Sequence, residues 1–256
     1  MVSESGREGQ ASRTRPLAVV TGASAGIGEA IARRLAEEGF RLLLGARRAG
    51  PVQRLASELG AQGRVLDVSD EGSVAQFCAE AGDAQILVNN AGGARGADQV
   101  GASVSSQWRW MWEVNVLGLM QMTRALLPAL ESSGQGHIVN ISSTAGLEVY
   151  EGGAGYTGAK HAVHAISQTL RLELSGRPIR ITEVSPGMVQ TEFALNRYGG
   201  DAERAAAVYR GVTALTAADV ADVVAFAVSR PAHVNLDQIV MRPVQQASAY
   251  KVTRRD

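Results

Sequence analysis

Short apolar runs alternate with amphipathic helical patterns along almost the whole chain, and this alternation limits the fold more than any other feature. Strands separated by helices build a parallel sheet with helices on both faces. Ile86-Leu87-Val88 is apolar without interruption, as a strand covered on both faces requires. The sequence therefore predicts an α/β fold with a doubly wound, Rossmann-type parallel sheet. The expected strands span residues 17–20, 41–46, 64–67, 86–89, 137–142, 179–184 and 237–241, and the expected helices span 27–38, 51–59, 70–81, 105–131, 156–175 and 217–229.

Two segments fall outside the alternation. Residues 188–216 follow the sixth expected strand, and a long insert at the carboxyl end of a strand is a typical position for a substrate loop. Residues 1–15 contain charges, serines and glycines without an apolar core, so we expect a disordered leader and not a secretory signal. Residues 16–256 have the length of a single catalytic domain.

The composition excludes several classes of partner. Basic and acidic residues both number 25, so no charge excess favours nucleic acid or a membrane surface. The chain also lacks an apolar run of about 18 residues, the minimum for a membrane span. The single cysteine, Cys78, excludes an internal disulfide and fits a reducing cytoplasm. It lies in a helical pattern with Val74 and Phe77, where we expect it to pack.

A glycine-rich turn follows the first expected strand. The sequence TGASAGIG at residues 21–28 lies between the apolar run 17–20 and a helical pattern that stops at Gly39. Backbone N–H groups and the positive helix end bind phosphate at such a turn, and glycines let the pyrophosphate of a dinucleotide come close. The spacing is G-x-x-x-G-x-G, and its place between strand and helix supports this interpretation. The residues expected to bind the cofactor here are Gly22, Ser24, Gly26, Ile27 and Gly28.

Acid–base chemistry is indicated by Asn115, Ser143, Tyr156 and Lys160. Tyr156 and Lys160 are four residues apart in an expected helix, so they share one face. A lysine ammonium beside a phenol lowers the tyrosine pKa from its usual value of about 10, which makes the phenol a usable proton donor and acceptor. Ser143 lies thirteen residues before Tyr156, at the end of an apolar run. The pattern predicts proton transfer with an alcohol or carbonyl substrate.

Neighbouring residues offer alternatives to two of these assignments. Ser142 competes with Ser143, although the thirteen-residue spacing to Tyr156 favours Ser143. Tyr150 competes with Tyr156, but position 154 is occupied by Ala154, which is not basic.

Other polar residues near these positions have both functional and structural interpretations. Asn115 lies in the middle of an expected helix, where asparagine is a poor helix former. It either kinks the helix and holds a water that links Lys160 to solvent, or it is purely structural. His161 and His164 have no carboxylate or cysteine at ligand spacing, so we expect surface or packing roles and no metal site.

The chain resembles the short-chain dehydrogenase/reductase family. The matching motifs occur in the order and spacing of that family over residues 17 to about 245. They are the turn at 21–28, Asp67-Val68, Asn89-Asn90-Ala91-Gly92, Asn115, Ser143, Tyr156, Lys160 and Pro186-Gly187.

The resemblance implies a role for each motif. Tyr156 would be the general acid/base, Ser143 would hold the substrate oxygen, and Lys160 would also bind the nicotinamide ribose. Asp67 would meet the adenine with Val68 beside it, although it could instead cap a turn, and Asn89 could instead pin neighbouring strands. The remaining cofactor contacts implied are Asn90, Ala91 and Gly92 under the adenosine ribose, Pro186 and Gly187 beneath the nicotinamide, and Val189 and Thr191 at its carboxamide.

The end of the second expected strand favours NADP(H) over NAD(H). Sites for the unphosphorylated cofactor place a carboxylate there for the ribose 2′-hydroxyl, but residues 41–50 contain none. Arg47 and Arg48 occupy this position, and a guanidinium binds a 2′-phosphate bidentately. Arg47 is the preferred candidate, although both arginines could instead begin a solvated helix.

Within the family, the chain is most similar to bacterial NADP-dependent 3-hydroxy acid dehydrogenases of the serine type. The motifs that carry this likeness are Ser142-Ser143-Thr144-Ala145-Gly146, Tyr150, Gly152-Gly153, Thr191-Glu192-Phe193, Pro231 to Asn235 and Arg242-Pro243-Val244. A hydroxy acid needs a counter-charge, for which Arg95 and Arg197 are candidates, although either could be a solvated loop residue. The alternatives are reduction of a bulkier neutral ketone or a ketoacyl substrate, and dinucleotide sensing without catalysis.

The family also implies assembly into homodimers or homotetramers through the expected helices at 105–131 and 156–175. Trp108, Trp110 and Trp112 spread around the first of these helices, and we expect them to serve both core and subunit contact.

Overall fold

Residues 15–255 are described by the computed structural model, so the expected leader lies outside the described residues except for Arg15. The strands form one sheet in the order β3-β2-β1-β4-β5-β6-β7, with parallel neighbours throughout. They are β1 (Leu17–Thr21), β2 (Arg41–Ala46), β3 (Gln62–Val65), β4 (Ala84–Asn89), β5 (Gly136–Ile141), β6 (Ile179–Pro186) and β7 (Gln238–Met241). The chain order reverses between β1 and β4, which is where an open parallel sheet of this type binds ligands.

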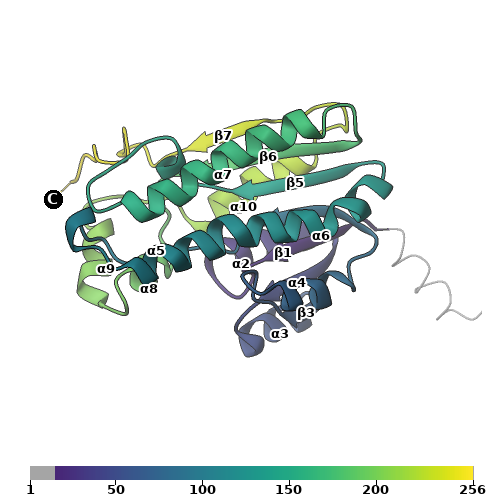
Figure 1. The fold of residues 1–256 in the computed structure, drawn as a ribbon, viewed down its shortest axis with the longest axis horizontal. Helices are drawn as coiled ribbons and strands as arrows, with labels where there is room; N and C mark the ends of the chain where they lie inside the picture. Colours follow the sequence, from purple (N-terminus) through teal and green to yellow (C-terminus); the bar gives the residue numbers. More distant parts are fainter. Residues whose placement is uncertain (1–14, 256) are drawn as a thin grey trace, which may run out of the picture.

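Helices cover both faces of this sheet (Figure 1). On one face lie α2 (Gly26–Glu37), α3 (Ala49–Glu58) and α10 (Ala217–Val228), and on the other lie α4 (Glu71–Cys78), α6 (Gly118–Ser132) and α7 (Ala154–Glu173). Strand periodicity separates the two cores, since Ala18 and Val20 pack with the first group whereas Leu17 and Val19 pack with the second. The expected doubly wound α/β fold is confirmed.

Strand β3 begins and ends two residues earlier than the expected 64–67. It is the edge strand of the sheet, so its extent follows its only neighbour and not an apolar run. Gln62 pairs with Leu43, and Val65 pairs with Ala46, where β2 ends. Asp67 therefore lies in the loop beyond the strand.

The expected helix at 105–131 is continuous but not uniformly α-helical. It consists of α5 (Ser105–Trp112), a π-helical turn at Glu113–Leu117, labelled η2, and α6. Asn115 lies in this wider turn, and its Nδ2 donates a hydrogen bond to the carbonyl oxygen of Met111 at 2.7 Å. Insertion of a side-chain donor into the helical hydrogen bonds is a common cause of such a local widening.

The insert at 188–216 contains two short helices, α8 (Phe193–Arg197) and α9 (Ala202–Tyr209). Residues 242–255 then return across it, and the backbone N–H of Arg255 donates to the carbonyl oxygen of Gly211 at 2.9 Å. The sequence did not predict this C-terminal contact. Within residues 15–255, no helix is long and apolar enough to cross a membrane.

Candidate active site

The carboxyl ends of the strands surround a cavity of about 800 Å³. It extends from the glycine-rich turn after β1 to the insert and the C-terminal segment. Its walls include the expected catalytic residues Ser143, Tyr156 and Lys160, and all of the other expected cofactor residues: Gly22, Ser24, Gly26, Ile27, Gly28, Arg47, Arg48, Asp67, Val68, Asn90, Ala91, Gly92, Pro186, Gly187, Val189 and Thr191.

The glycine-rich turn is folded tightly against itself and against the loop after β4. Gly22 and Gly26 have φ angles of 67° and 57°, in the region that favours glycine. A Cβ atom on Gly28 would lie 2.4 Å from both the Gly22 carbonyl oxygen and Asn90 Nδ2. The turn can therefore present bare backbone to an anion at the start of α2, as a dinucleotide pyrophosphate requires.

Thr21 ties this turn to the loop after β4. Its Oγ1 accepts hydrogen bonds from the backbone N–H groups of Asn90 at 3.0 Å and Ala91 at 2.9 Å, and it donates to the Val88 carbonyl oxygen at 3.2 Å. The Asn90 Nδ2 donates to the Thr21 carbonyl oxygen at 2.9 Å. Thr21 was not singled out from the sequence, because its role depends on a loop that is distant along the chain.

Asn89 has the structural role that the sequence left open. It is buried, and its Nδ2 donates to Thr123 Oγ1 at 3.1 Å and to Asn140 Oδ1 at 3.0 Å. It therefore joins β4 to β5 and α6 and does not face the cavity.

Positive charge gathers at the end of β2. The guanidinium of Arg47 lies 5.8 Å from the ring centre of Trp110. The charge of Arg47 also helps lower the pKa of Asp67: burial raises this pKa, but the hydrogen bonds from Ser69 and the charge of Arg47 outweigh burial. Asp67 Oδ1 accepts from the Ser69 N–H at 3.0 Å, so Asp67 does cap the turn, as one interpretation of the sequence expected.

Arg48 points toward the insert and not along β2. It donates to Ser24 Oγ at 3.3 Å and to the Ser24 carbonyl oxygen at 3.2 Å, and it lies 3.4 Å from the carboxylate of Glu192. These contacts link the glycine-rich turn to the loop before α8. Arg47 is the less engaged of the two arginines.

Ser143 and Tyr156 meet at the wall of the cavity. The Ser143 hydroxyl accepts from the Ala145 N–H at 3.1 Å and donates to the Pro186 carbonyl oxygen at 3.4 Å, and it is close enough to Tyr156 to lower the pKa of the phenol. Ser142 is also buried, but its hydroxyl has no hydrogen-bond partner among the described residues. The structure therefore places Ser143 beside the phenol, in agreement with the spacing argument, while its role stays a prediction.

The sequence led us to expect that Lys160 lowers the pKa of Tyr156, but in the structure this pKa is raised. Burial, followed by the neighbouring Tyr150, raises the pKa of Tyr156 well above its usual value, although Ser143 and Arg197 oppose the change. Burial also lowers the pKa of Lys160 to about 8, against the charge of Glu183. Lys160 Nζ donates to the Ile141 carbonyl oxygen at 2.9 Å and lies 5.9 Å from the centre of the Tyr156 ring. Burial is therefore the main influence on the pKa values of both groups.

Asn115 uses its side chain to hold the loop after β4. In addition to its bond to Met111, Nδ2 donates to the Gly93 carbonyl oxygen at 2.9 Å, and Oδ1 accepts from the Gly93 N–H at 3.1 Å. A Cβ atom on Gly92 would lie 2.6 Å from Asn115 Oδ1. This position explains the local helix distortion, while a water between Lys160 and solvent stays a prediction.

The two arginines expected near the substrate lie in different surroundings. Arg95 stacks on Trp110, with its guanidinium carbon 4.0 Å from the ring centre. Arg197, in α8, donates to Tyr150 Oη at 2.9 Å and to the Gly96 carbonyl oxygen at 3.0 Å. Tyr150 thus forms a pair with Arg197 at the cavity wall, while Tyr156 lies beside Ser143.

Gln246 was missed from the sequence because it lies just beyond Arg242-Pro243-Val244 and its partner is distant along the chain. It is buried, and its Oε1 accepts from the Met188 N–H at 2.8 Å. A Cβ atom on Gly187 would lie 2.2 Å from the same oxygen. Gln246 therefore fixes the backbone after β6, where the expected contacts Val189 and Thr191 follow. Residues 15–255 hold no cluster of three or more His, Cys, Asp or Glu side chains that could bind a metal ion.

Comparisons with known proteins agree with this geometry. Residues 16–200 match the short chain dehydrogenase family. An uncharacterized oxidoreductase of Mycobacterium tuberculosis is 55% identical over 91% of this chain and 93% of that protein. An NADP-dependent 3-hydroxy acid dehydrogenase of Salmonella typhi is 40% identical over 91% of this chain and 97% of its own length. The closed form of a serine dehydrogenase complexed with NADP+ superimposes with a TM-score of 0.89 at 38% identity, covering 94% of this chain and all of that one. The chain belongs to the short-chain dehydrogenase family.

Proposed function

We propose that this protein is an NADP(H)-dependent oxidoreductase that interconverts a short 3-hydroxy acid and its carbonyl form. The observation that carries the proposal is the placement of Ser143, Tyr156 and Lys160 on the same cavity as the glycine-rich turn and Arg47. The names of the Salmonella relative and of the NADP+-bound serine dehydrogenase support both the cofactor and the substrate class.

The residues around the turn fit a phosphorylated dinucleotide. A Cβ on Gly28 would clash with the Gly22 carbonyl oxygen and with Asn90 Nδ2, so glycine permits the tight turn whose backbone N–H groups would bind the pyrophosphate. Arg47, with Arg48 beside it, would bind the 2′-phosphate, and Asp67 with Val68 would flank the adenine. When bound, the nicotinamide supplies or accepts the hydride. The other proposed contacts are Asn90, Ala91, Gly92, Pro186, Gly187, Val189 and Thr191, with Tyr156 and Lys160 at the nicotinamide ribose.

The side chains of the site supply the proton transfer. In reduction, Tyr156 Oη donates its proton to the substrate oxygen, and in oxidation it takes the proton back. The raised pKa keeps the phenol protonated, which suits donation. Ser143 Oγ holds the substrate oxygen against Tyr156, and the ammonium of Lys160 stabilises the phenolate once the proton has left. Asn115 fixes the loop at Gly93 so that this arrangement is maintained.

Arg197 is the better candidate for the substrate carboxylate. Its contacts with Tyr150 and Gly96 fix the guanidinium in the wall of the cavity while leaving further N–H groups for an acid. Arg95 stacks on Trp110, and this contact holds its guanidinium against the indole ring. Arg197→Lys should therefore raise KM for acids far more than KM for a neutral alcohol.

A panel of alcohols with both cofactors tests the proposed function. Nicotinamide absorbance would be followed with NADP+ and NAD+ against L- and D-serine, 3-hydroxypropionate, 3-hydroxyisobutyrate and a neutral secondary alcohol. Turnover of the acids with NADP+ is the expected result. Turnover of the neutral alcohol alone would retain the mechanism but exclude a hydroxy acid. Absence of turnover, followed by activity on bulkier ketones with NADPH, would move the protein to the alternative substrate class.

We further infer a homodimer or homotetramer in the cytoplasm. The helix that contains α5 and η2 exposes Trp108, Trp112 and Leu117, which are 39%, 48% and 38% exposed, and this apolar surface favours subunit contact. Cys78 is a free thiol whose pKa burial raises to about 11, as suits a packing residue in a reducing compartment. Sedimentation of the purified protein would give the assembly, and a monomer would exclude it.

A further inference from the structure

Two oppositely charged side chains are buried between α7 and the sheet, one of them in the wall of the proposed active site. Among residues 15–255, Lys160 and Glu183 are the only lysine, arginine, aspartate or glutamate residues whose exposure falls in the buried range, at 6% and 0%. Burial of an ion is costly unless an opposite charge or hydrogen bonds compensate it. The burial of Lys160 and Glu183 in the same region therefore requires interactions that compensate both charges.

The sheet directs Glu183 toward the helix that carries Lys160. Along β6, Val184 packs in the core beneath α2 and α10, whereas Ile181 packs in the core on the α6 side. Since side chains alternate along a strand, Glu183 points to the same face as Ile181, where α7 lies. Lys160 Nζ reaches the Ile141 carbonyl oxygen on β5, and Ile141 pairs with Val184, the residue after Glu183. The ammonium, which extends from α7, therefore bonds to β5 at the position that pairs with Val184, one residue after Glu183 on the adjacent strand.

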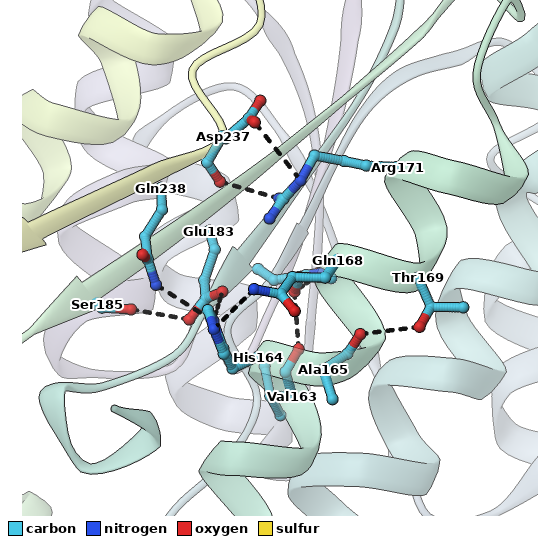
Figure 2. A network of polar contacts seen from close by, with 12 residues as sticks. Val163, His164, Ala165, Gln168, Thr169, Arg171, Glu183, Ser185, Asp237 and Gln238 are labelled. Atoms are coloured by element: carbon cyan, nitrogen blue, oxygen red, sulfur yellow. Dashed lines mark hydrogen bonds and ion pairs between the residues drawn. The ribbon is translucent and has the colours of Figure 1, made fainter. Parts of the chain in front are cut away.

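The carboxylate of Glu183 is held on both of its oxygens (Figure 2). His164 Nδ1 lies 2.7 Å from Oε2, and Ser185 Oγ donates to Oε1 at 2.9 Å. Because a carboxylate accepts, the proton of a neutral His164 lies on Nδ1, and its Nε2 can then accept from Gln168 Nε2 at 3.0 Å. A His164 that carries its proton on Nδ1 thus bonds both Glu183 and Gln168, whereas Gln238 Nε2, 3.2 Å from the same nitrogen, is itself a donor and gains no hydrogen bond from it. His164 lies one turn after Lys160 on the same face of α7.

We propose that Glu183 is the buried counter-charge of Lys160, fixed in place by His164 and Ser185, and thus a positioning residue for the proton transfer at Tyr156. This rests on the proposed function for the role assigned to Lys160. The sequence assigned His164 to a surface or packing role, since a partner on a distant strand cannot be seen from local spacing. In the structure it secures a buried carboxylate instead.

The surrounding charges leave Glu183 as the main electrostatic partner of Lys160. Its charge raises the pKa of Lys160, while burial lowers this pKa to about 8. On α5 and η2, which also pack against α7, Arg109 and Glu113 are exposed and screened by water. On β5, burial lowers the pKa of His137 to about 3, so this ring is uncharged.

Two other titratable groups of this region, Arg180 and Tyr156, do not add a charge that faces Lys160. Arg180 on β6 donates to the carbonyl oxygens of Ala227 and Val228 at the end of α10, on the opposite face of the sheet. Tyr156, on the same helix as Lys160, is held protonated by its raised pKa. The charge that decides the protonation of Lys160 is therefore that of Glu183.

The chain is well suited to a direct test, because Lys160 and Lys251 are its only two lysines. Lysine labelled with ¹³C at the ε carbon gives two NMR signals, and the exposed Lys251 serves as an internal reference. Glu183→Gln keeps the shape of the side chain and removes its charge, so the pKa of Lys160 should fall by about one unit or more. Glu183→Asp should restore part of that loss. Asp237→Asn removes an exposed carboxylate near Arg171 in the same polar network and should leave the pKa of Lys160 unchanged.

An unchanged Lys160 titration in a folded Glu183→Gln variant would overturn the proposal, and so would an equal shift in Asp237→Asn. If Glu183→Gln does not fold, the double variant with Lys160→Met decides the question. Removal of both buried charges should restore folding, whereas a double variant that also stays unfolded would refute the pairing. Neither measurement uses a substrate, so absence of turnover would count against the proposed function alone.

Discussion

Cofactor choice is predicted to depend on Arg47. Within residues 15–255 its guanidinium makes no side-chain hydrogen bond, so it is available to a 2′-phosphate, whereas Arg48 already contacts Ser24 and Glu192. A hydrogen bond to a charged group contributes about 1.5–3 kcal/mol, and because Arg47 is exposed the lower part of this range applies. Arg47→Ala should therefore weaken NADPH binding about 10- to 50-fold, with NADH affected less than about threefold.

The assay is a fluorescence titration of both reduced cofactors at low and moderate salt. The difference in affinity between NADPH and NADH should shrink as salt rises, because screening weakens exposed charge pairs. Arg54→Ala removes one positive charge from α3 outside the cavity and is the matched control, with both affinities expected to stay near those of the parent protein. Equal losses for NADPH and NADH in Arg47→Ala would refute the assignment of the 2′-phosphate to this arginine.

Three further perturbations follow from the site. Gly28→Ala places a Cβ 2.4 Å from the Gly22 carbonyl oxygen, so the glycine-rich turn has to shift. Calorimetry should therefore show loss of cofactor binding in a folded protein, and an unchanged affinity would contradict a pyrophosphate bound directly to this turn. Asn115→Leu leaves the Gly93 groups unpaired and should lower the free energy of unfolding by about 1–3 kcal/mol, whereas a neutral result in denaturant titration would exclude the clamp. Because burial lowers the pKa of Lys160 from 10.5 to about 8, the unfolded chain binds more protons between these values. Its stability relative to Lys160→Met should therefore rise with pH there by roughly 1 kcal/mol per unit, and a flat difference would contradict the burial cost.

The order of elements and the cavity walls were predictable because they follow from local patterns. Apolar periodicity placed the strands, and the TGASAGIG turn placed the phosphate site at the switch between β1 and β4. The edge strand β3 was misplaced by two residues, since its limits depend on pairing with β2 and not on its own composition.

The features that the sequence did not reveal depend on contacts between distant segments. Thr21 bonds to the loop after β4, and Gln246 reaches back to Met188 from the C-terminal segment. The pKa of Tyr156 was expected to fall beside Lys160, yet it rises because both groups are buried, and spacing along a helix carries no information about desolvation. The partnership of His164 with Glu183 was not expected either, because it joins α7 to a strand that is distant along the chain.

The most direct test of the account compares NADP+-dependent oxidation of 3-hydroxy acids by the parent protein and by Tyr156→Phe. The substitution removes one hydroxyl and keeps the ring that packs on Phe193, 5.4 Å away between centres. The account predicts that kcat nearly vanishes, while NADPH affinity stays within severalfold and shows that the site remains intact. Retention of most of the activity in Tyr156→Phe would contradict proton transfer by this phenol and with it the proposed mechanism.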